Sequence, residues 1–139
     1  MSWKIRDENT VQSVETSFSI VKYIQAENGA RVTDIANELN MSKGAVHRYL
    51  STLRKHGYLV KEDNLYCLGL GFLELGYHTM YRHEVSQIAE RKVEQLAQET
   101  GERAQFVIEE RVEGVYVHLE GVVNAVSTDA RIGKRINLT

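Results

Sequence analysis

Four cationic side chains stand close together in the segment from Ser42 to Gly57, and this segment holds no aspartate or glutamate. They are Lys43, Arg48, Arg54 and Lys55. Lysine and arginine neutralise backbone phosphates, and an arginine can also donate two hydrogen bonds to the edge of a guanine. The chemistry that these residues favour is therefore the binding of nucleic acid.

The same segment has the pattern of a helix that could hold those side chains on one side. Ser42 is a preferred N-cap residue, and Gly57 supplies the left-handed conformation that often ends a helix. An apolar stripe at helical spacing is formed by Val46, Tyr49, Leu50 and Leu53. The opposite side carries Gly44, His47, Arg48, Ser51 and Arg54. We therefore expect an amphipathic helix with one buried face and one face toward DNA.

Two helices are predicted before this segment. The first is expected to begin after a cap at Asn9 or Thr10 and to end at Asn28. Its inward face is expected to be the stripe Val11, Val14, Phe18 and Val21, widened by Ile20 and Ile24. The second helix is expected to be capped by Thr33 and ended by Asn40.

A β-hairpin is predicted after the cationic helix. Residues 58–69 contain two short apolar runs around the turn Glu62-Asp63-Asn64. Three helices followed by a hairpin are typical of a winged helix-turn-helix, whose second motif helix enters the major groove of DNA. An ordinary solvated helix face could carry the same four charges, but the capped preceding helix, the short turn and the hairpin favour DNA binding.

The winged helix predicts which side chains meet DNA. His47 and Arg48 are assigned to base edges, and Arg54 to the phosphate backbone. Lys61, before the hairpin turn, is assigned to a neighbouring phosphate. The complete predicted DNA-binding set is Thr33, Ser42, Lys43, Gly44, His47, Arg48, Ser51, Arg54 and Lys61.

The total charge of −2 and the isoelectric point near 6.2 are unusual for a DNA-binding chain. Residues 1–83 carry ten lysines and arginines against nine acids, whereas residues 84–139 carry seven against ten. The acidic excess therefore lies in the C-terminal part, and the cationic helix keeps its local charge.

The C-terminal part is predicted to contain two helices and a small sheet. A helix over 70–83 carries an apolar side that we assign to a dimer interface, formed by Leu70, Leu73, Tyr77, Met80 and Tyr81. A helix over 84–100 is expected to bury Val85, Ala89, Val93 and Leu96. Strands are expected over 103–110, 115–120 and 125–132, with His118 and Glu120 on the solvent face.

Other chemistries find little support in the residues. No catalytic triad or Gly-rich phosphate loop is present, so we expect no catalytic residues, no enzyme activity and no cofactor. His78 and His83 are five residues apart and Cys67 is distant, which argues against a metal site. A redox role for the single cysteine stays open. The sequence contains no run of eighteen apolar residues, so we expect no membrane partner and a cytoplasmic protein.

The residues resemble the IclR family of bacterial and archaeal regulators. The distinctive motif is S-K-x-x-V-H-R-x-L-x-T-L-x-x-x-G-Y-L from Ser42 to Leu59, followed by L-G and F-L-E-L-G. The similarity continues through QLAQETGERAQFVIEERVEGVYVHLEG and covers nearly all of the chain. The family usually has Ser-Thr at the place of Gly44-Ala45, and commonly an arginine at the place of Thr16.

The resemblance implies an α+β fold with three parts. These are a winged helix-turn-helix over 1–69, a linker helix over 70–83, and over 84–139 the truncated N-terminal part of a GAF-like α/β effector-binding domain. It also implies a homodimer, or a tetramer of two dimers, on a palindromic operator in double-stranded DNA. A small-molecule effector would bind the complete domain.

Two alternatives stay open at this point. Family members continue well beyond the place of Thr139, so the chain is either a fragment or a short form completed by a second subunit. The winged helix could also serve as a protein-interaction module without an operator of its own.

Overall fold

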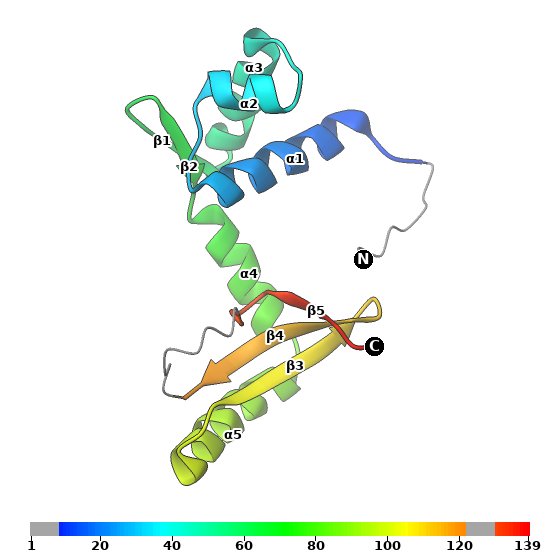
Figure 1. Cartoon of the computed structure of the whole chain (residues 1–139), viewed down its shortest axis with the longest axis vertical. Coiled ribbons are helices and arrows are strands. Elements are labelled where there is room, and N and C mark those ends of the chain that lie inside the picture. Colours follow the sequence, from blue (N-terminus) through cyan, green and yellow to red (C-terminus); the bar gives the residue numbers. More distant parts are fainter. Residues whose placement is uncertain (1–8, 122–129) are drawn as a thin grey trace. The chain divides into compact units, whose positions relative to one another are not determined.

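The computed structural model of the chain describes residues 9–121 and 130–139. These residues form two compact units, one ending at Tyr77 and the other beginning at His78, and each is described by itself. The elements, in chain order, are α1 (Gln12–Glu27), α2 (Val32–Glu38), α3 (Lys43–Lys55), β1 (Leu59–Glu62), β2 (Leu65–Leu68), α4 (Gly71–Tyr81), α5 (Glu84–Thr100), β3 (Ala104–Glu110), β4 (Glu113–Glu120) and β5 (Arg135–Asn137) (Figure 1).

The first unit is built around one apolar core to which α1, α2, α3 and the hairpin all contribute. Its buried members are Ile20, Ile24, Ala30, Ile35, Ala36, Val46, Leu50, Leu59 and Tyr66. Removal of this apolar surface from water is the main force that holds the three helices together. The core therefore fixes α3 from one side and leaves its other side to solvent.

The structure confirms the predicted bounds of α3. Ser42 Oγ accepts a hydrogen bond from the backbone N–H of Ala45 at 3.1 Å, so Ser42 is the N-cap. Gly57 follows the last turn with a φ of +83°, as a helix-ending glycine does. Asn40 has a φ of 51° and ends α2, which sets the short turn before α3.

The predicted hairpin is also confirmed. β1 and β2 are antiparallel, with Leu59 opposite Leu68, and Asp63 turns the chain with a φ of 54°. The N–H of Ala30 donates to the carbonyl of Tyr66 at 3.0 Å, and the N–H of Tyr66 donates back at 2.8 Å. This bridge ties the hairpin to the loop between α1 and α2, as in a winged helix.

Two glycines let the chain pass close to the end of α3. A Cβ atom on Gly69 or on Gly71 would lie 2.7 Å from the carbonyl oxygen of Gly57. The Gly69 N–H donates to the carbonyl of Tyr58 at 2.8 Å across this crossing. Only glycine fits such a close approach, which explains why residues 68–71, L-G-L-G, contain two glycines.

Both helix caps predicted for α1 and α2 were wrong. The N-cap of α1 is Val11, not Asn9 or Thr10, and it makes no side-chain capping bond. The N-cap of α2 is Arg31, so Thr33 lies inside the first turn. The Arg31 N–H donates to the carboxylate of Asp34, the third residue of the helix, at 3.2 Å, which is the acidic half of a capping box.

The inward face predicted for α1 was also largely wrong. Val11, Val14 and Phe18 are 62%, 51% and 61% exposed, whereas Ile20 and Ile24 are buried. Both sets recur at helical spacing, so periodicity alone could not choose between them. The contacts with α3 and the hairpin select the Ile20 and Ile24 side.

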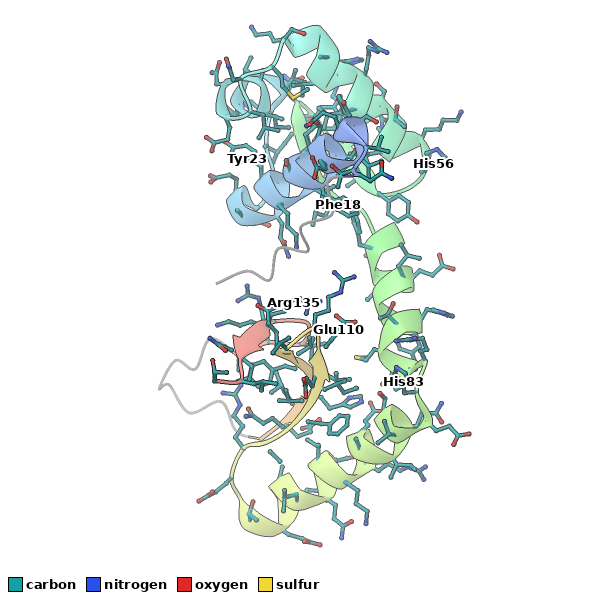
Figure 2. All side chains as sticks on the ribbon, turned by 90° about the vertical axis from the view of Figure 1, so that its right-hand side faces the viewer. Phe18, Tyr23, His56, His83, Glu110 and Arg135 are labelled. Atoms are coloured by element: carbon teal, nitrogen blue, oxygen red, sulfur yellow. The ribbon has the colours of Figure 1, made fainter. Side chains whose placement is uncertain are left out.

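The second unit packs α5 against an antiparallel sheet of order β3-β4-β5 (Figure 1). Its small core contains Val93, Ala97, Ala104 and Phe106. The predicted antiparallel pairing of the first two strands is confirmed, and their turn lies at Arg111-Val112, slightly before the expected position. Across β4, Arg135 of β5 forms an ion pair with Glu110 of β3 at 2.5 Å (Figure 2).

Two other expectations for this unit need correction. The buried side of α5 consists of Ser86, Ala89, Val93 and Ala97, while Val85 and Leu96 are exposed. The inward stripe is thus rotated relative to the predicted one, because the sheet and not the largest side chains decides it. Most of the predicted third strand, residues 125–129, lies outside the described residues, and the third strand of the sheet is β5.

His118 is buried, contrary to the expected solvent position, while Glu120 is exposed as predicted. The register of β3 and β4 shifts by one residue between Phe106 and Val107, which marks a β-bulge. A bulge breaks the in-out alternation, so the neighbours Val117 and His118 are both buried. The His118 ring lies 6.3 Å from that of Phe106.

Candidate nucleic-acid interface

The predicted DNA-binding residues of α3 and its cap all lie at the surface of the first unit. Val46 and Leu50 are fully buried and anchor the opposite side of the helix. The exposed positions are Ser42, Lys43, Gly44, His47, Arg48, Ser51 and Arg54. One rigid element therefore presents these residues together, as a recognition helix must.

The remaining two predicted residues lie on neighbouring elements of the same unit. Thr33 is exposed in the first turn of α2, and Lys61 is exposed on β1. The Nζ atom of Lys61 lies 5.6 Å from the ring centroid of the buried Tyr66, its partner across the hairpin. This cation–π contact favours one position for the lysine on the hairpin.

The N-terminal turn of α3 is open and suited to an anion. Nothing lies within 4 Å of the place where a Cβ on Gly44 would stand. The N-terminus of a helix carries partial positive charge, and its amide groups point outward. A phosphate could therefore approach the backbone at Gly44 without meeting a side chain.

The charges of the first unit are distributed unevenly over its helices. α3 has no acidic residue, and its last turn carries Arg54 and Lys55. Around Tyr23, burial raises the pKa of the phenol, and the carboxylates of Glu27, Asp34 and Glu38 raise it further. Acids thus lie on α1 and α2, and also at Glu62 and Asp63 of the hairpin, whereas α3 carries none and its exposed face stays cationic.

A groove between α1 and α3 was not expected from the sequence. Its volume is about 530 Å³, and its walls include Ser13 and Ser17 from α1 and Arg48, Tyr49 and Thr52 from α3. The spacing of Ser13 and Ser17 with Ile20 and Ile24 places both serines on the inward side of α1. That spacing could have indicated the groove from the sequence, but only if the buried side of α1 had already been known.

The predicted dimer residues of α4 do not all share one environment. Leu70, Leu73 and Tyr77 are 79%, 63% and 59% exposed, whereas Met80 and Tyr81 are partly buried. The Tyr81 hydroxyl donates to Glu90 Oε1 at 2.8 Å. An exposed apolar surface therefore remains on the N-terminal part of α4, while Tyr81 packs within the second unit.

Neither a metal site nor a membrane span is found among the described residues. No group of three histidine, cysteine or acidic side chains there could hold a metal ion. No helix in the same residues is long and apolar enough to cross a membrane. Cys67 is partly buried, with its sulfur 3.2 Å from the place where a Cβ on Gly29 would stand.

Residues 13–63 match the family model described as the IclR helix-turn-helix domain. Among curated proteins, the chain is 31% identical over 130 residues to the HTH-type transcriptional regulator XynR of Escherichia coli. That alignment covers 91% of this chain and 51% of the relative. The chain thus spans about half the length of the curated relatives that it matches.

Solved structures share the fold of the described residues. The IclR protein of Thermotoga maritima superimposes with a TM-score of 0.77 at 24% identity, over 90% of this chain and 51% of that one. An IclR homologue of Microbacterium hydrocarbonoxydans, solved with 4-hydroxybenzoate, has a TM-score of 0.75 at 20% identity, over 91% and 53% of the two chains. The predicted α+β class, with a winged helix before a small α/β region, is confirmed.

Proposed function

We propose that the chain is a DNA-binding transcription regulator of the IclR family, since residues 13–63 match the model of the IclR helix-turn-helix domain. The observation that carries the proposal is the exposed cationic side of α3, held in place by buried Val46 and Leu50. The matching curated relatives are HTH-type transcriptional regulators. This favours a regulator over an enzyme, and also over a protein-interaction module that has no operator.

In the proposed complex, α3 enters the major groove of double-stranded DNA. His47 lies one turn after the open Gly44, where side chains of a recognition helix reach base edges. Lys43, Arg54 and Lys61 are placed to neutralise phosphates on either side of the groove. Affinity should therefore fall steeply as salt rises, since counterions are released on binding.

Fluorescence anisotropy with a duplex from the promoter of the chain's own gene tests this function. The duplex is titrated at several salt concentrations, with an unrelated duplex of equal length and composition as control. We expect tighter binding to the promoter duplex and a linear fall of log affinity with log salt. Retention that does not depend on salt, or no binding to either duplex, would reject the proposal.

A variant with Lys43, Arg48 and Arg54 all changed to alanine separates DNA binding from protein binding. The three side chains are exposed, so the variant should fold like the parent protein. DNA affinity should collapse in the variant. Unchanged DNA affinity together with loss of a protein partner would support the protein-interaction module instead.

We further propose a homodimer, or a tetramer of two dimers, on a palindromic operator. The exposed Leu70, Leu73 and Tyr77 support a partner along α4, because contiguous exposed apolar surface commonly marks an interface. We place the winged helix at residues 1–69 and the linker helix at 70–83. Residues 84–139 then form part of a domain that binds a small-molecule effector when complete, in a cytoplasmic protein.

A further inference from the structure

The groove between α1 and α3 is lined by Arg48 but not by the other outward residues of α3. Gly44, His47, Ser51 and Arg54 follow one another at spacings of three or four residues and form a single outward stripe. Arg48 lies between this stripe and the groove-facing residues Ala45 and Thr52, one turn after Gly44, and it lines the groove together with Ser13 and Ser17 of α1. Arg48 thus borders both the outward stripe of α3 and the junction of α3 with α1.

The groove combines one cation with several hydroxyl groups. The Ser17 hydroxyl donates to the carbonyl of Ser13 at 2.9 Å, and the Thr52 hydroxyl donates to the carbonyl of Arg48 at 2.9 Å. A hydroxyl can rotate to donate to an anion instead, while its oxygen can accept a bond from a guanidinium. The walls of the groove therefore suit an oxygen-rich anion held by Arg48.

The charge of Arg48 has no counterpart in the groove. None of its lining residues is acidic, and no described residue forms an ion pair with the Arg48 side chain. Tyr49 and Leu53 add apolar walls, beside which a charge is less screened than in open water. An arginine in this position favours an anion that accepts two hydrogen bonds, as a phosphate does.

We propose that Arg48 and the hydroxyl-lined groove between α1 and α3 bind a phosphate of the DNA backbone. Arg48 then fixes the depth and angle of α3 in the major groove, and base recognition passes to the stripe that contains His47. This assignment rests on the proposed DNA-binding function. It replaces the expectation that Arg48 reads a base edge.

Replacement of Arg48 tests the assignment. Loss of a phosphate contact weakens binding to every DNA sequence, whereas loss of a base contact weakens binding only to the sequence that contains that base. Anisotropy titrations compare Arg48→Ala with the parent protein on the promoter duplex and on the unrelated duplex. We expect the same fold-loss of affinity on both duplexes. We also expect the magnitude of the salt slope to fall by about 0.9 for each bound protomer, the value for one phosphate.

Two further variants sharpen the test. Arg48→Lys keeps the charge and should keep most of the salt slope on both duplexes. A base contact that needs two hydrogen bonds from one guanidinium group would be lost in this variant. Lys22→Ala removes an exposed charge from α1 one turn after Phe18, outside the groove lining, and should leave the slope unchanged.

Two results would overturn the assignment. One is a loss of affinity in Arg48→Ala that is confined to the promoter duplex, and the other is an unchanged salt slope. Failure of the parent protein to bind either duplex is a different result, because it rejects the DNA-binding function itself.

Discussion

Ser42 Oγ accepts a hydrogen bond from the backbone N–H of Ala45 at 3.1 Å, and this contact holds the first turn of α3. The same turn carries Lys43 and Gly44, two residues assigned to DNA. A local capping bond therefore supports both the stability of the first unit and the geometry of its proposed interface.

Ser42→Ala should lower the free energy of unfolding by about 1 kcal/mol, since the Ala45 N–H loses its acceptor. Urea unfolding followed by circular dichroism measures the change. Ser42→Asp keeps an acceptor at this position and should stay close to the parent protein. If Ser42→Ala were as stable as the parent, the capping role would be wrong.

Gly69→Ala should destabilise the first unit by about 1–3 kcal/mol, because its Cβ would press against the carbonyl oxygen of Gly57. Gly76→Ala is the matched control, since nothing lies within 4 Å of its added Cβ inside α4. That control should gain about 0.5–1 kcal/mol from the higher helix propensity of alanine. Thermal unfolding of both variants measures the difference, and equal melting temperatures would refute the steric account.

His47→Ala should weaken binding to the promoter duplex by about 1–3 kcal/mol and leave the unrelated duplex nearly unchanged. The reason is that His47 belongs to the outward stripe of α3, which faces the base edges in the proposed complex. Competition titrations give the ratio of the two affinities. An equal loss on both duplexes would instead make His47 a backbone contact.

Leu73→Glu should shift the chain from dimer to monomer without unfolding it. Leu73 is 63% exposed on α4, so a charge there costs little in the folded chain but is unfavourable in an apolar interface. Sedimentation velocity at several concentrations measures the assembly state, with Glu74→Gln on the next position as control. A parent protein that is monomeric at every concentration would rule out the proposed dimer.

Glu110→Gln should remove a small pH dependence of stability in the second unit. The hydrogen bond from Arg135 holds the pKa of the Glu110 carboxyl below its ordinary value. The ion pair therefore stabilises the fold above that ordinary value and is lost as the pH falls through the lowered pKa. Both side chains are partly exposed, so the effect should stay below about 1 kcal/mol.

Urea unfolding of the parent protein and of Glu110→Gln at pH 7 and near pH 3 checks this prediction. The difference between the two proteins should be largest at pH 7 and should shrink toward pH 3. A difference that grows with acidity would contradict the assigned direction of the pKa shift.

Much of the first unit could be predicted from local residue patterns. Ser42, Gly57 and the apolar stripe from Val46 to Leu53 specify α3 within a few turns of chain. The turn at Asp63 likewise specifies the hairpin. Capping, helical periodicity and turn chemistry are local properties, so these elements are encoded without knowledge of their neighbours.

The choice of buried faces depends on distant parts of the chain. α1 offers one stripe with Phe18 and another with Ile20 and Ile24, and only the second meets the core. That choice brings Ser13 and Ser17 beside Arg48 and creates the groove. In the second unit, a bulge in the strand pairing buries His118 against the expected alternation.

The sequence by itself determined the winged helix-turn-helix and the cationic, acid-free character of α3. Tertiary structure decided which side of each helix is buried, why Gly69 must be glycine, and that Arg48 but not His47 lines a groove with α1. The physical reason is that periodicity shows which residues share a face, whereas burial depends on what packs against that face.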